Sequence, residues 1–157
     1  MTSPCRRLAG SLLLAAAAAG AIATAAPAAD FRTTANAACV RYDRTTNALP
    51  QIASAAELKR RLVLVPKLFT TMVDRIAALD PPHADAARAG RLVASLRQVE
   101  RAMNRIRDAF LRGDQAGVDA AVRAGTPPSR VAARTAQALG LPACVRIAAQ
   151  AAKGSQP

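Results

Sequence analysis

An unbroken apolar seam in residues 58–79 constrains the fold more than any other feature of the sequence. The preceding Ser54-Ala55-Ala56-Glu57 is a capping box: the serine side chain accepts from the N–H of Glu57, and the glutamate reaches back to the N–H of Ser54. The seam residues recur at alternating steps of four and three: Leu58, Leu62, Val65, Phe69, Met72, Ile76 and Leu79. This spacing places them on one face of a long α-helix, and that face needs a partner helix.

A second seam follows after a short link. Asp80-Pro81-Pro82 stops the first helix, and Asp80 with Pro81 suits the cap and first position of the next helix. Gly113 is expected to end it. Its apolar face comprises Ala89, Leu92, Leu96, Val99, Met103, Ile106 and Phe110. Two long seams joined by so short a link should pack antiparallel.

Weaker helical patterns flank these two seams. Residues 30–49 carry an apolar face of Phe31, Ala35, Ala38, Tyr42 and Leu49, and the pattern stops at Pro50. A further helix begins at the cap Asp114 and ends at Gly140, and a short terminal helix follows. Because Pro127 and Pro128 remove backbone donors, we expect a break in it at Gly125. The pattern predicts an all-α, up-down four-helix bundle with a broken fourth helix, in which the first and last helices are neighbours.

The first 28 residues have the layout of a secretory signal peptide. Arg6 and Arg7 precede an apolar run over residues 8–23, and Ala26-Pro27-Ala28 matches an A-x-A cleavage site. Cleavage after Ala28 leaves a helical domain at residues 29–152 and a flexible tail at residues 153–157. The protein is then secreted or periplasmic, in the cell envelope. The alternative is anchorage by an uncleaved N-terminal helix, since residues 8–29 are long enough to span a bilayer.

Two cysteines remain after such cleavage, Cys39 and Cys144. In an oxidising compartment an even count indicates a disulfide, with two buried free thiols as the alternative. The antiparallel order brings both cysteines to the same end of the bundle. Closing a loop of about one hundred residues stabilises the fold by up to about 4.7 kcal/mol in the chain-entropy treatment. That is a large share of net stability for a chain whose apolar content is mostly alanine.

Several short motifs together resemble a group of small secreted helical proteins from bacteria with GC-rich genomes. The motifs are Ala38-Cys39, Ala48-Leu49-Pro50, Ser54-Ala55-Ala56-Glu57-Leu58, Leu79-Asp80-Pro81-Pro82, Gly113-Asp114 and Leu139-Gly140-Leu141-Pro142-Ala143-Cys144. The likeness covers most of the chain after the signal peptide, but every motif is structural. In that group the fourth helix is often continuous, so Pro127-Pro128 is a departure. The resemblance implies a fold and a compartment, and no functional residues.

The sequence contains few side chains that could act in catalysis. His83 is the single histidine, and with Asp80 and Asp85 it forms at most a weak divalent-metal site. The competing interpretation is an exposed helix start, where carboxylates favour the helix dipole. Apart from His83, the chain has no histidine that could act as a base for a serine nucleophile. We therefore expect a non-enzymatic protein without a catalytic site, metal or cofactor.

The strong positive charge is the sequence feature that points to a function. The whole chain carries a net charge of +12, which becomes about +10 once Arg6 and Arg7 are removed. On the second seam helix a stripe of arginines lies opposite the apolar face: Arg97, Arg101, Arg105 and Arg112, flanked by Arg91. Such a stripe favours an anionic envelope polymer, lipid headgroups or an acidic protein as partner. The alternative is an ordinary solvated face, and nucleic acid is disfavoured because the aromatic residues all occupy seams.

A second functional hypothesis concerns the bundle interior. Pro66 lies inside the first seam helix, and a proline kink can open a gap between helices. Met72 and Met103 would line such a gap. The protein would then be a carrier or sensor that holds a small apolar ligand, although both methionines are equally suited to filling an irregular core.

Overall fold

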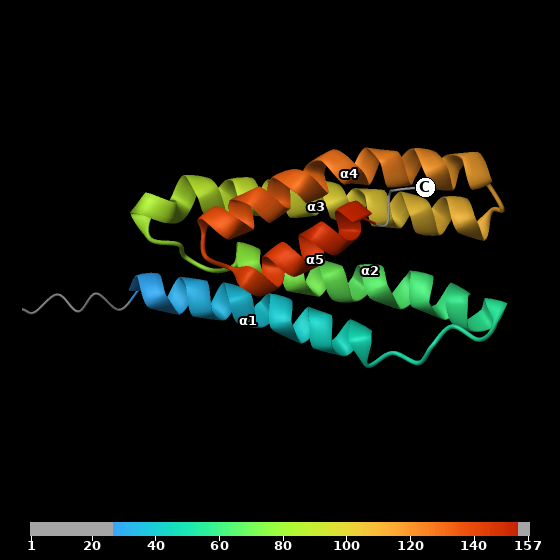
Figure 1. Ribbon diagram of the computed structural model, residues 1–157, viewed down its shortest axis with the longest axis horizontal. Coiled ribbons are helices and arrows are strands. Elements are labelled where there is room, and N and C mark those ends of the chain that lie inside the picture. Colours follow the sequence, from blue (N-terminus) through green and yellow to red (C-terminus); the bar gives the residue numbers. More distant parts are fainter. Residues whose placement is uncertain (1–26, 154–157) are drawn as a thin grey trace, which may run out of the picture.

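The computed structural model describes residues 27–153, which form five helices and no strand. The helices are α1 (Pro27–Asn47), α2 (Ala55–Ala77), α3 (His83–Leu111), α4 (Gln115–Ala138) and α5 (Pro142–Lys153). Figure 1 shows that successive helices run in opposite directions. The predicted all-α fold is confirmed.

Local signals set several helix ends as the sequence predicts. Ser54 caps α2, with its side-chain oxygen 3.2 Å from the N–H nitrogen of Glu57. The Glu57 carboxylate accepts chiefly from the N–H of Ala53, at 2.8 Å, rather than from Ser54. This bond is the main reason that the pKa of Glu57 lies below its ordinary value. Asp114 caps α4 by accepting from the N–H of Gly117 at 2.8 Å.

Two glycines end α3 and α4 in the same way. Gly113 and Gly140 have φ of +72° and +71°, a left-handed conformation that glycine adopts without a Cβ clash. In each case the next residue donates its N–H back into the helix, from Asp114 to Ala109 and from Leu141 to Ala136, both at 2.9 Å. These are Schellman motifs, which satisfy carbonyls that the helix end leaves unpaired.

The predicted start of α3 is wrong by two residues. The helix begins at His83, its cap position is Pro82, and Asp80 makes no capping bond. Pro82 explains the shift, because a proline keeps the residue before it out of the helical region. Pro81 therefore belongs to the link.

The break expected at Gly125 is not confirmed. A single helix runs from Gln115 to Ala138 with Pro127 and Pro128 inside it. Figure 1 shows its axis changing direction along its length, the usual response to internal proline. The hydroxyls of Thr126 and Ser129 donate to helix carbonyls four residues earlier, at 3.2 and 2.8 Å. These side-chain bonds add to the backbone hydrogen bonds of the bent segment, where the two prolines have no N–H to donate.

The short helix α5 has a larger part in the architecture than the sequence suggests. It packs against both α1 and α4, and no close backbone contact between α1 and α4 occurs within residues 27–153. The expectation that the first and fourth helices are neighbours is therefore wrong, because α5 lies between them (Figure 1). Asn36 of α1 fixes the start of α5 by accepting from the N–H of Ala143 at 2.9 Å.

The disulfide joins α1 to α5. Cys39 and Cys144 are bonded with their Cα atoms 5.2 Å apart, and they are 0% and 2% exposed. The predicted bridge is confirmed, and it lies between the middle of α1 and the first turn of α5. It lies in the core among Phe31, Leu92, Leu139, Leu141 and Ile147.

The core fills only one half of the bundle. On α2 and α3 the buried large residues are Phe69, Met72, Val73, Ile76, Leu92, Leu96 and Val99. Toward the start of α2 and the end of α3, the seam residues are only half-buried: Leu58, Leu62, Val65, Met103, Ile106 and Phe110. The cause is the length of the outer helices, since Arg61 of α2 already bonds the carbonyl of Thr46, near the end of α1. Beyond that point α2, α3 and α4 continue without α1 beside them (Figure 1).

The predicted signal peptide at residues 1–28, its alternative as an anchor, and the tail at residues 153–157 fall almost wholly outside the described residues. Pro27 and Ala28 already belong to α1, and Lys153 ends α5. Within residues 27–153 no helix has the length and apolar character needed to cross a membrane.

We expect the double variant Cys39→Ala, Cys144→Ala to fold with a free energy of unfolding lower by about 2 to 5 kcal/mol, the usual range for a lost native disulfide. The buried site accepts alanine without leaving an unpaired polar group. Urea unfolding of the oxidised protein and of the variant measures the difference, with reduced wild-type protein as the control. Equal midpoints for all three would contradict a stabilising role.

Candidate functional site

The arginines of the predicted stripe do not share one environment. Arg91, Arg101 and Arg105 are exposed on α3 and Arg112 at its C-cap, and within residues 27–153 no carboxylate lies within 4.0 Å of any of them. Arg105 and Arg112 also line a shallow cleft of about 340 Å³ beside the start of α4. These four side chains remain available for an anion.

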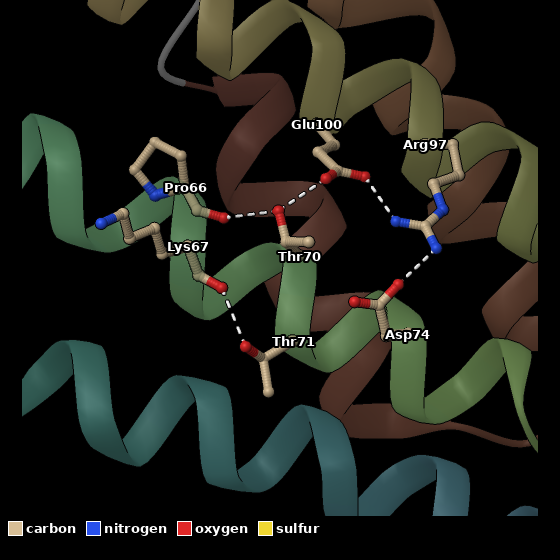
Figure 2. A network of polar contacts seen from close by, with 7 residues as sticks. All are labelled: Pro66, Lys67, Thr70, Thr71, Asp74, Arg97 and Glu100. Atoms are coloured by element: carbon tan, nitrogen blue, oxygen red, sulfur yellow. Dashed lines mark hydrogen bonds and ion pairs between the residues drawn. The ribbon is translucent and has the colours of Figure 1, made fainter.

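Arg97 is used differently, in a polar network between α2 and α3 (Figure 2). Its guanidinium nitrogens lie 2.9 Å from Glu100 and 2.5 Å from Asp74 of α2. The hydroxyl of Thr70 lies 2.5 Å from the other Glu100 oxygen and 3.1 Å from the carbonyl of Pro66. The two carboxylates hold the pKa of Arg97 above its ordinary value. Arg97 therefore holds α2 against α3, and its charge is already neutralised.

The three residues of the possible metal site are separated by their surroundings. His83 and Asp80 are exposed, whereas Asp85 is buried and binds Arg32 of α1 at 2.9 Å and Arg88 at 3.5 Å. In the described part of the chain no three histidine, cysteine or acidic side chains are grouped so that they could hold a metal ion. Asp85 instead connects α1 to α3, which have no close backbone contact.

The three residues of the predicted ligand gap do not line a common cavity. Pro66 and Met72 are buried, and Met72 borders a small cleft of about 120 Å³ near α1. Met103 lines a different cleft of about 320 Å³, together with Phe69, Ile106, Val122 and Ile147. This cleft, which we call the mouth cleft, lies where the packed half of the bundle meets the open half.

Tyr42 contributes a phenol hydroxyl to the lining of the mouth cleft, beside the polar side chains of Thr46, Ser129 and Gln150. It is the only tyrosine of the chain, it lines the cleft, and its ring packs edge-on against Phe69 with centroids 5.5 Å apart. Burial, helped by the charge of Asp43, raises the pKa of Tyr42 to about 12. None of the side-chain hydrogen bonds of residues 27–153 involves its hydroxyl, and no buried side-chain polar atom of these residues lacks a partner, so the hydroxyl reaches solvent at the cleft.

Sequence reasoning missed two further basic surfaces. Arg123, Arg130 and Arg134 are exposed on α4 at spacings of seven and four, which place them on one face. Beside α1, a broad depression of about 700 Å³ is lined by Arg32, Arg41 and Arg44 and reaches Pro142 at the start of α5. Helical spacing alone could have revealed the α4 line, but the depression depends on how α5 packs.

The sequence matches no protein-family model, and comparison with the curated proteins and with the solved structures found no match. The function of the chain is therefore inferred from the geometry of the molecule.

We expect Asp85→Asn to lower the free energy of unfolding by about 1 to 2 kcal/mol, because the buried side chain loses a charge bonded to two arginines that are themselves half-exposed to water. The matched control is Asp80→Asn, an exposed neighbour without an ion pair, which should change stability by less than about 0.5 kcal/mol. Urea titration measures both. Equal effects would show that the link between α1 and α3 contributes nothing.

The raised pKa of Tyr42 predicts a loss of stability at high pH. Between its ordinary pKa of 10.0 and its folded value of about 12, the folded chain keeps the phenol proton that the unfolded chain releases. The free energy of unfolding should therefore fall as the pH rises through this window. Tyrosinate absorbance reports this residue alone, so its midpoint should be near 12 in the folded protein and near 10 in guanidinium. A folded midpoint no higher than the one in guanidinium would contradict the buried environment.

Proposed function

We propose that this chain is an exported, non-enzymatic helical module that binds an anionic component of the cell envelope through its basic surface. The observation that carries the proposal is a set of exposed arginines along α3 and at its C-cap. These arginines have no carboxylate partner in the described part of the chain: Arg91, Arg101, Arg105 and Arg112.

The distribution of charge supports this proposal. Five arginines form the ion pairs of the described residues, and they use five of the ten acidic side chains. Four more acids bond a neighbouring side chain or take part in capping a helix: Asp30, Glu57, Asp114 and Asp119. Most of the positive charge is therefore uncompensated at the surface, where it attracts anions in a salt-dependent way.

Lipid headgroups, an anionic envelope polymer and an acidic protein all carry the required charge. A binding module of this kind is consistent with the exported location that the N-terminal sequence predicts, and with the resemblance to small secreted bacterial proteins. His83, the single histidine, is exposed, and its neighbour Asp85 is bonded to Arg32 and Arg88.

The test compares two triple variants that remove the same charge. In the first, Arg101 and Arg105 of α3 and Arg112 at its C-cap become Gln; in the second, Arg123, Arg130 and Arg134 of α4 become Gln. Each basic side chain near an anionic surface is worth about 1 kcal/mol, so the α3 variant should bind phosphatidylglycerol vesicles roughly a hundredfold more weakly than the wild type. The α4 variant should lose much less.

Binding of each protein is measured at low and at high salt, on phosphatidylglycerol vesicles, on uncharged phosphatidylcholine vesicles and on polyphosphate. Equal losses for the two triple variants would assign binding to net charge and refute the α3 surface. No binding to either anionic ligand at low salt would refute the proposal.

A further inference from the structure

The mouth cleft is formed by all five helices. Tyr42 comes from α1, Phe69 from α2, Met103 from α3, Val122 from α4 and Ile147 from α5. Its lining includes Thr46 near the end of α1 and Gln150 near the end of α5. Its position therefore follows from the unequal helix lengths, and the apolar seams supply its walls.

The lining restricts the charge of an occupant. None of the described side chains that line the mouth cleft carries a charge. Because an ionised group taken out of water needs a counter-charge, this lining favours an uncharged occupant. The basic surface, in contrast, selects for anions. The two regions therefore favour different ligands.

The hydrogen-bonding groups of the lining restrict the ligand further. The hydroxyls of Thr46 and Ser129 already donate to backbone carbonyls of their own helices. The side chain of Gln150 is exposed. The Tyr42 hydroxyl forms no such bond within residues 27–153, and it reaches solvent in the cleft, since no buried polar atom of these residues lacks a partner. A ligand with one acceptor, such as a carbonyl, would give it a hydrogen bond that the described protein groups do not supply.

The volume restricts the size. About 320 Å³ lies at the lower end of small-molecule pockets, which are roughly 300 to 1,000 Å³, and is too small to take a helix of about 10 Å diameter from a partner protein. We propose that the mouth cleft binds an uncharged, mainly apolar small molecule with a hydrogen-bond acceptor, which faces Tyr42. This site is independent of the anion-binding surface.

The test uses prodan, an uncharged naphthalene ketone whose emission shifts to the blue in apolar surroundings. We expect saturable binding of one prodan per chain, equally tight at low and at high salt. Anilinonaphthalenesulfonate is the charged comparison, and its binding to the basic protein should weaken as salt screens the charges. Failure of the anion-binding experiments would leave the prodan result unaffected, so the two proposals are tested separately.

Two substitutions on α3 form a matched pair. Met103→Trp fills the mouth cleft and should weaken prodan binding at least about tenfold, since the ligand loses its space. Leu111→Trp adds the same ring at an exposed position that lines no described cleft, and it should leave affinity unchanged. Circular dichroism and thermal melting establish that both variants are folded.

Tyr42→Phe removes the hydroxyl and keeps the ring against Phe69. It should weaken prodan binding by about two- to tenfold, the usual net worth of one hydrogen bond. Unchanged affinity would overturn the role of Tyr42. The proposal as a whole is overturned if the wild type shows no saturable prodan binding, or if Met103→Trp binds prodan as tightly as Leu111→Trp.

Discussion

The covalent link between α1 and α5 is the constraint on which the rest of the structure depends. The two cysteines lie 105 residues apart in sequence and are fully buried, so the bond both closes the chain and occupies the core. One turn before Cys39, Asn36 bonds the backbone of Ala143 and sets the direction in which α5 leaves the bridge. Held in this way, α5 lies between α1 and α4 and completes a ring of contacting helices. Many of the buried residues are alanines, so a covalent connection contributes a large share of net stability.

The same arrangement divides the bundle into a packed half and an open half. Because α5 has only 12 residues and α1 ends beside Arg61, three helices continue without cover. Seam residues such as Ile106 and Leu62, which the packed half would bury, stay half-exposed there. The mouth cleft lies at this boundary and is therefore a direct result of helix length. An apolar pocket at one place and arginines over the surface give the molecule two chemically distinct binding regions.

The sequence predicted the ends of the helices correctly where an interaction between nearby residues sets them. The caps at Ser54 and Asp114 and the stops at Gly113 and Gly140 depend on bonds within a few residues, and all four were correct. The prolines are the exception. Pro127 and Pro128 suggested a break, but a helix packed along two neighbours tolerates lost donors by bending. The candidate arginines were placed on the right face of α3, yet helical spacing could not show that Arg97 would meet Asp74 from another helix.

By itself, the sequence determined which residues form helices, which face of each helix is apolar, and that positive charge exceeds negative charge. These properties follow from the spacing of apolar residues, from capping and from composition. Spacing and capping depend on residues close in sequence, and composition is a sum over the whole chain. Only the tertiary structure decided that α5 is the partner of α1, that the core fills one half, and that Tyr42 lines a cleft where its hydroxyl reaches solvent. The physical reason is that periodicity identifies a buried face but contains no information on which helix covers it or where along its length that cover ends.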